Sequence, residues 1–135
     1  MINPVPLCTA LAIAAAALIW PLEPALADIN GDWLVEDIDG KGVIDMARTS
    51  LSFNDDGQAA GSGGCNGFTG SVTFSGNDIS FGLLAVTRKM CSPALMNQEM
   101  DFFKALDAAK TFKVEGAFLR IYDAAGNALL RLTKL

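Results

Sequence analysis

The stretch GSGGCNGFTG at residues 61–70 is half glycine and carries a single cysteine. A stretch of this kind can form a phosphate-binding loop, contribute to a metal site, or bend the backbone beside one end of a disulfide bond. Each alternative requires different residues around the stretch. The flanking sequence therefore indicates which of them applies, and whether an enzyme is to be expected.

A nucleotide-binding loop does not fit this stretch. The dinucleotide fingerprint needs glycine at its first, third and sixth positions, directly before a helix. Counted from Gly61, the sixth position is Asn66, and the Gly-Lys-Ser/Thr sequence of a P-loop is also missing. Residues 71–75 indicate a strand, so no helix N-terminus follows that could bind phosphate.

A metal site lacks its ligands, because structural zinc needs about four, mostly Cys and His. The chain has no histidine, and beyond its N-terminal segment its cysteines are Cys65 and Cys91. We therefore expect no metal and no other cofactor. The two cysteines also lack the C-x-x-C spacing of a redox-active pair.

Cysteine pairing remains as the explanation. Two cysteines are expected to form a disulfide if the chain is exported to an oxidising compartment. A Cys65–Cys91 bridge would fasten the start of a helix predicted at residues 92–110 to the glycine-rich stretch. The alternative is a pair of buried free thiols, which follows if the Cβ vectors of the two residues diverge. Gly64, Gly67 and Gly70 then serve to bend the backbone where the sheet turns around the helix.

Residues 1–27 indicate export. Residues 7–20 are apolar apart from Thr9, a run shorter than the roughly 20 residues of a membrane-spanning helix. Two prolines follow, and then ALA at 25–27, the small-x-small pattern that precedes signal-peptidase cleavage. We predict a cleavable signal peptide and a periplasmic or secreted mature domain over 28–135, with no stable membrane span after cleavage. The alternative is an uncleaved N-terminal anchor.

The acidic balance of the chain excludes some classes of partner. Its formal net charge is −5, from 15 acidic and 10 basic residues, and Arg88-Lys89 is its single adjacent basic pair. Recognition of nucleic acid requires a basic surface, and docking to anionic lipid requires a basic cluster. We expect neither.

Most of the mature chain alternates apolar and polar residues with a period of two, between Gly or Asn/Asp turns. This pattern is typical of antiparallel hairpins. The predicted strands cover residues 33–38, 51–53, 58–61, 72–74, 79–81, 111–115, 118–122 and 128–132. We expect seven or eight short strands in one sheet.

Residues 92–110 break this rhythm and predict one amphipathic helix. Ser92 suits the N-cap, Pro93 suits the first turn, and Lys110 complements the C-terminal end of the helix dipole. A single helix among many strands must bury its apolar face against the sheet. We therefore predict an α+β fold, a strongly curved antiparallel sheet or partial barrel packed around this helix. Its predicted apolar face comprises Leu95, Met96, Phe102, Phe103, Leu106 and Ala109.

Three motifs follow one another in the mature chain. They are GCNGFTG at 64–70, LLAVTRKMC at 83–91 and QEMDFFKAL at 98–106. In this order they resemble the META domain family, which is also called HslJ-like and has the patterns G-C-N-x-F-x-G, T-R-x-x-C and E-x-x-F/Y-x-x-A-L. The segment GDWLV at 31–35 is similar to the family's start, G-x-W-x-L.

The resemblance covers residues 28–135 and implies a curved antiparallel sheet wrapped around a helix. It also implies an envelope or secreted protein, and some members of the family are associated with stress or drug tolerance. No catalytic residues are established for the family. The polar positions that match its motifs include Asn66, Thr87, Arg88 and Glu99.

Glu99 is the polar residue of most interest, because helical spacing places it on or beside the buried face. A carboxylate there needs a partner, and Arg88 is the nearest cation along the chain before the helix. Asn66 and Thr87 could complete a polar cluster with them. We interpret this cluster as a structural lock that joins helix, loop and sheet. The alternative is a site that recognises a ligand or a partner.

Catalysis finds little support, because a chain without histidine cannot form a Ser-His-Asp or Cys-His arrangement. We predict a non-enzymatic exported envelope protein, a protein-interaction or stress-related module that stabilises the envelope. The alternative is a carrier in which Met96, Met100 and Phe103 line a cavity for a small apolar or lipid-like ligand. The simpler interpretation of these three residues is ordinary filling of the core, and we favour it.

Overall fold

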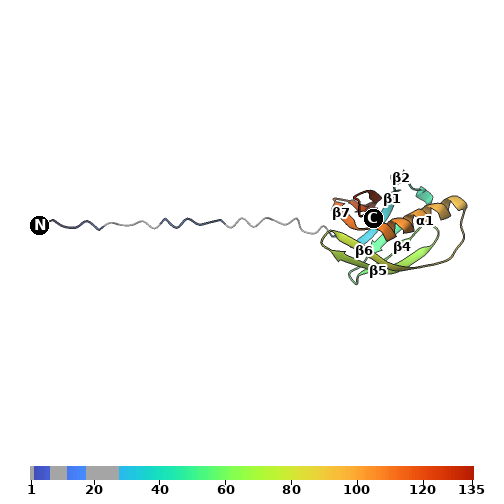
Figure 1. The fold of residues 1–135 in the computed structure, drawn as a ribbon, viewed down its shortest axis with the longest axis horizontal. Helices are drawn as coiled ribbons and strands as arrows, with labels where there is room; N and C mark the ends of the chain where they lie inside the picture. The colour runs from blue at the N-terminus through green and yellow to red at the C-terminus, as the bar shows by residue number, and fades with distance from the viewer. Residues whose placement is uncertain (1, 7–11, 18–27) are drawn as a thin grey trace.

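The computed structural model describes residues 2–6, 12–17 and 28–135. Residues 2–6 and 12–17 form no helix or strand and lie apart from the folded domain (Figure 1). The rest of the predicted signal peptide, with its cleavage site, lies outside the described residues, so the signal peptide stays a prediction. Within the described part, no helix is long and apolar enough to cross a membrane.

Nine strands and one α-helix form the domain. All strand pairings are antiparallel, in the order β2-β1-β3-β4-β5-β6-β7-β8-β9, and β1 also pairs with β9, so the sheet closes into an irregular ring. The α+β prediction is confirmed, while the two-residue strand β2 and the 3-10 helix η1 were not expected. The elements are β1 (Gly31–Ile38), β2 (Lys41–Gly42), η1 (Asp45–Ala47), β3 (Ser50–Phe53), β4 (Gln58–Ser62), β5 (Gly67–Ser75), β6 (Asp78–Val86), α1 (Pro93–Ala108), β7 (Thr111–Glu115), β8 (Phe118–Tyr122) and β9 (Ala128–Lys134).

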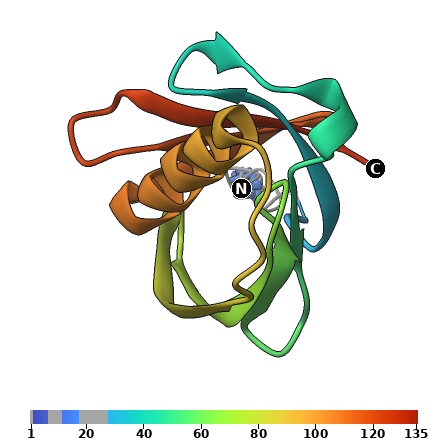
Figure 2. The same ribbon diagram turned by 90° about the vertical axis from the view of Figure 1, so that its right-hand side faces the viewer.

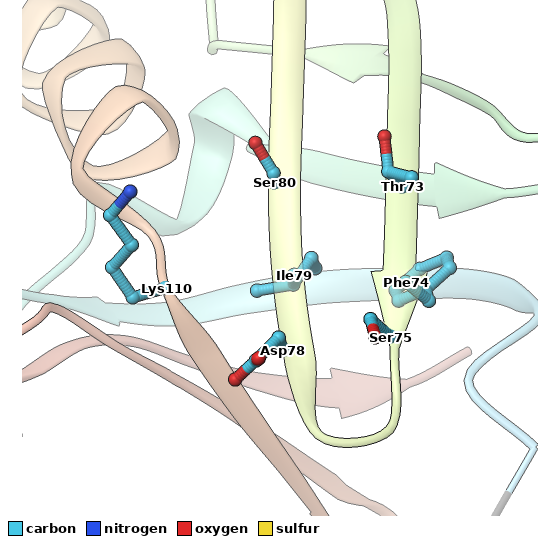
Figure 3. A pocket seen from close by; sticks show the side chains of 7 residues that line it. All are labelled: Thr73, Phe74, Ser75, Asp78, Ile79, Ser80 and Lys110. Carbon is cyan, nitrogen blue, oxygen red and sulfur yellow. The ribbon is translucent and has the colours of Figure 1, made fainter.

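The ring is weakest between β6 and β7, where α1 interrupts the series of hairpins. β5 and β6 pair along most of their length, whereas β6 and β7 share the single register pair Asp78↔Thr111. The backbone N–H of Ile79 adds one bond to the carbonyl of Lys110, at 2.9 Å. In Figure 3 the chain passes from α1 through Lys110 into β7 near Asp78, while β5 and β6 continue side by side. α1 lies across the opening of the ring (Figure 2).

The core fills the ring with side chains from both the sheet and the helix. Trp33 of β1, Leu132 of β9, and Phe102 and Leu106 of α1 are at most 1% exposed. Phe102 also packs edge-on against Phe68 of β5, with 5.7 Å between the ring centroids. Burial of these large apolar groups is the main force that holds α1 in the ring.

α1 follows the predicted amphipathic pattern, with differences at its ends. Ser92 occupies the N-cap position, but its hydroxyl makes no capping hydrogen bond, and its carbonyl accepts the N–H of Met96 at 3.0 Å. The helix ends at Ala108, so Lys110 lies beyond it, in the link to β7. Of the predicted apolar face, Phe102, Leu106 and Ala109 are buried, and Leu95, Met96 and Phe103 are half-buried.

The glycine-rich stretch is a β-hairpin rather than one bent strand. β4 ends at Ser62, β5 begins at Gly67, and residues 63–66 form the loop between them. The N–H of Gly63 donates to the carbonyl of Asn66 at 2.8 Å and closes this loop. The chain therefore reverses direction within four residues beneath α1.

The bending role predicted for three glycines fits two of them. Gly64 has φ +120°, in the region that L-residues rarely adopt. Gly70 lies beside a break in the β5–β6 register, and a Cβ there would lie 2.8 Å from the carbonyl oxygen of Leu83. Gly67 has room for a side chain, because the nearest atom to its Cβ would be 3.7 Å away.

We expect Phe102→Ala to lower the free energy of unfolding by about 3–5 kcal/mol, because it leaves a cavity between α1 and the sheet. Phe118→Ala is the matched control, since this phenylalanine is 43% exposed and its truncation should cost less than about 1 kcal/mol. Denaturant unfolding measures both values. Equal losses for the two variants would contradict the placement of Phe102 in the core.

Candidate functional site

The described residue that combines charge with deep burial is Glu99, in the second turn of α1. Its side chain is 4% exposed. One carboxylate oxygen, Oε1, accepts the backbone N–H groups of Cys65 at 3.1 Å and of Asn66 at 2.5 Å. The other, Oε2, accepts the side-chain amide of Asn66 at 2.7 Å. Two successive backbone N–H groups of a loop form a concave site for an anion, and Glu99 occupies it.

Asn66 extends this network to the segment that connects β6 with α1. Its Oδ1 atom accepts the hydroxyl of Thr87 at 2.9 Å and the backbone N–H of Lys89 at 2.6 Å. The Thr87 hydroxyl in turn accepts the N–H of Gly67 at 3.2 Å. We name Glu99, Asn66 and Thr87 the Glu99 cluster. It joins the helix, the hairpin loop and the β6–α1 connection.

A disulfide lies next to the cluster, between Cys65 and Cys91. The Cα atoms of the two cysteines are 6.1 Å apart, within the usual range for a bridge. The alternative of two free thiols is not what the structure shows. The bond fastens the hairpin loop to the residue before the N-cap of α1.

Two further polar residues support the hairpin loop, and sequence reasoning missed both. Thr49 is buried, and its hydroxyl donates to the carbonyl of Gly63 at 3.2 Å. Gln98 donates to the Thr49 hydroxyl at 3.4 Å and accepts the backbone N–H of Ile44 at 2.8 Å. The signal that could have identified Gln98 is its position in the motif QEMDFFKAL, directly before Glu99. Thr49 lies outside the recognised motifs.

The predicted ion pair between Glu99 and Arg88 does not form. In the described part of the chain, the one ion pair joins Lys113 and Glu115. Arg88 is exposed and takes part in none. The reason is that the hairpin loop already supplies the N–H groups that the carboxylate needs. The network brings Asn66 and Thr87 together with Glu99, as expected, and leaves Arg88 on the surface.

The Glu99 cluster has the chemistry of a structural contact. Its oxygen atoms are occupied by N–H and O–H groups of the protein itself. A Cβ on Gly63 would lie 2.6 Å from the Cγ of Glu99, so the loop backbone packs directly on this side chain. Among residues 2–6, 12–17 and 28–135, no group of three His, Cys, Asp or Glu is placed to hold a metal ion.

An apolar groove lies beside the cluster, between α1 and the end of β6. Its volume is about 450 Å³. It includes Met96, Met100 and Phe103, the three residues proposed from the sequence for apolar contact. Phe103 also packs against Phe68, with 5.5 Å between centroids, so it serves the core as well. We name this feature the α1–β6 groove, and it is lined by Val86, Met96, Glu99, Met100, Phe103, Lys104 and Asp107.

A second hollow, of about 380 Å³, lies at the β5–β6 hairpin beside Lys110 (Figure 3). Hydroxyl groups of Thr73, Ser75 and Ser80 line it, together with Asp78. The amine of Lys110 points away from Asp78. The acidic and basic side chains of this hollow, Asp78 and Lys110, therefore do not face each other. The α1–β6 groove is the stronger candidate site.

We expect Glu99→Gln to lower the free energy of unfolding by about 1–3 kcal/mol, because an amide group then faces buried N–H donors. Arg88→Ala should change it by less than about 0.5 kcal/mol, as at other exposed sites. The double variant should match Glu99→Gln alone. Urea unfolding of the three variants checks this. A large loss for Arg88→Ala, together with a double-variant loss smaller than the sum of the two single losses, would show that the two residues are coupled.

We expect loss of the disulfide in a Cys65→Ser/Cys91→Ser variant to lower the free energy of unfolding by about 3.5 kcal/mol. The estimate follows from the loop entropy of a bridge that spans 26 residues. Reduction of the wild-type protein should give the same loss, measured by denaturant unfolding. A wild-type protein that is insensitive to reductant would contradict this account, and the variant serves as the insensitive control.

The profile of the META domain family matches residues 25–134. No curated protein matches the chain. Among solved structures, one determined by NMR is 25% identical, with a TM-score of 0.61 over 76% of this chain and 86% of that one. An NMR structure of a protein from Burkholderia xenovorans is 22% identical, with a TM-score of 0.64 over 78% of this chain and 82% of that one.

A crystal structure of a DUF4847 family protein from Bacteroides vulgatus ATCC 8482 shares 14% identity, with a TM-score of 0.57 over 78% of this chain and 93% of that one. At such low identity, this likeness and the Burkholderia one concern the fold alone. The family profile covers most of the chain, including every strand, the helix and the Glu99 cluster. The chain therefore belongs to the META domain family.

Proposed function

We propose that this chain is an exported, non-enzymatic META domain that binds another protein of the cell envelope and stabilises the envelope under stress. The observation that carries the proposal is the α1–β6 groove. Met100 lines it and is 55% exposed, although methionine is a side chain that proteins usually bury. Flexible, polarisable methionine is also common at surfaces that accept varied apolar partners.

The disulfide supports the exported location. Disulfide bonds persist in oxidising compartments and are rare in the cytosol of mesophiles. The Cys65–Cys91 bond therefore favours the periplasm or the exterior of the cell. The composition of residues 1–27 favours the same location. The association with stress comes from the family resemblance.

The site chemistry supports a binding role over a catalytic one. Glu99 is the buried acid beside the groove, and its oxygens accept hydrogen bonds from the hairpin loop. The other charged groups along the groove, Lys104 and Asp107, are exposed. Such an arrangement offers apolar contact with a charged rim, which is the usual anatomy of a protein interface.

A small apolar or lipid-like ligand is the second candidate. The groove volume of about 450 Å³ falls within the range of small-molecule sites, about 300–1,000 Å³. Those sites, however, enclose most of the ligand surface, whereas the exposure of Met100 shows that this groove opens to solvent. A protein partner can cover the open side with its own surface, so we favour a protein.

We expect a photo-crosslinking amino acid in place of Met100 to capture an envelope protein when the full chain is expressed and irradiated in cells. The same amino acid in place of Met46 is the control, because Met46 is 94% exposed and lies in η1, outside the groove. Mass spectrometry identifies each adduct. An adduct specific to position 100 supports the proposal if it is a protein and supports the second candidate if it is a lipid. Identical adducts at both positions, or none, would overturn both.

A further inference from the structure

We propose that the unpaired edge of β6 accepts an extended segment of the partner protein as an added antiparallel strand, with its apolar side chains in the α1–β6 groove. The inference rests on the proposed function, because it specifies how the protein partner binds. The interaction surface is residues 81–86 of β6, and the partner is an extended peptide with apolar residues at alternate positions.

The first observation is that β6 loses its second neighbour after Ile79. β5 accompanies β6 from Asp78 to Val86, with a break in the register at residues 82–83. On the other side, the ladder to β7 contains one register pair at Asp78, and Ile79 makes the last backbone bond, to Lys110. In Figure 3 the chain that enters β7 departs from β6 at this point. One long edge of β6 therefore faces α1 without a paired strand.

The register shows which residues form this edge. Alternate residues of an antiparallel strand direct their N–H and C=O groups to the same side. The N–H of Thr87 donates to Gly67 of β5, so Leu84 and Val86 face away from β5. Ile79 donates to Lys110, so Phe81 faces the same way. Across the described residues, these three make no hydrogen bond on that side.

The second observation is that this edge borders the groove. Val86 belongs to both, since it lines the groove and is 38% exposed. The facing wall is Met96, Met100 and Phe103 of α1. A strand added along β6 would place every second side chain on the inner side of the sheet, toward these three residues. Backbone bonds then supply affinity, and the groove selects the side chains.

Charge complementarity specifies one end of the partner. Arg88 and Lys89 follow the edge directly, and they are the single adjacent basic pair of an acidic chain. Both are exposed, and neither forms an ion pair with a carboxylate of the described residues. An antiparallel segment would have its N-terminal end near this pair. We therefore infer an acidic residue at the N-terminal end of the bound segment.

The test uses the protein recovered after export and a synthetic hexapeptide of alternating valine and threonine that begins with aspartate. We expect binding to slow amide hydrogen exchange at Phe81, Leu84 and Val86 by at least tenfold, with no such change on β8. A peptide of the same sequence with N-methylated valines is the matched control. It should bind at least tenfold more weakly, because it cannot donate the strand bonds.

Two protein variants test the groove separately from the edge. Met100→Ser should weaken peptide binding several-fold, whereas Met46→Ser, at an exposed methionine outside both the groove and β6, should leave it unchanged. Binding that survives N-methylation, exchange that stays unchanged at Leu84 and Val86, or equal effects of the two variants would overturn the proposal. Protection of these amides without peptide, rising with protein concentration, would assign the edge to a second copy of this chain and also overturn it.

The failure of this inference is distinguishable from failure of the proposed function. A protein adduct at position 100 in cells, with no peptide effect on β6, would overturn the added strand and leave the proposed function in place. Peptide binding at β6 with no adduct at position 100 would overturn the proposed envelope partner while supporting the strand edge.

Discussion

A buried carboxylate is stable in a protein when hydrogen-bond donors satisfy its oxygen atoms, and Glu99 obtains these donors from the hairpin loop 63–66. The loop has to turn tightly to direct two successive N–H groups toward one oxygen, which explains why it contains Gly63 and Gly64, whose backbone packs directly against α1. Asn66 takes part twice, through its backbone and its side chain. The position of the helix therefore depends on the shape of this loop.

The attachments of α1 are unevenly distributed. The disulfide at Cys91, the Gln98 side chain and Glu99 all fasten the N-terminal half of the helix to the hairpin loop and its surroundings. Apolar packing by Phe102 and Leu106 holds the C-terminal half. The α1 wall of the α1–β6 groove is thus fixed in advance. A partner that enters the groove loses little free energy to ordering of the protein, which favours binding.

Much of the fold follows from local sequence patterns, because period-two alternation and turn residues act over a few residues. β7 and β8 match the predicted bounds, and the helix differs by one or two residues at each end. The closure of the ring by β1 and β9 could not be predicted, because no local pattern records which distant strands pair. β2 is too short to show a period.

The site was predictable in part, for a related reason. Motif positions indicated that Asn66, Thr87 and Glu99 lie together, and the network confirms their proximity. Charge alone suggested Arg88 as the partner of Glu99, yet backbone N–H groups fill that role, and a sequence does not display where they point. Pairing of the first and last strands has another consequence: β1 lacks its second neighbour until β9 has been synthesised. Contacts so distant along the chain form slowly, so closure of the ring is a late step in the folding of the domain.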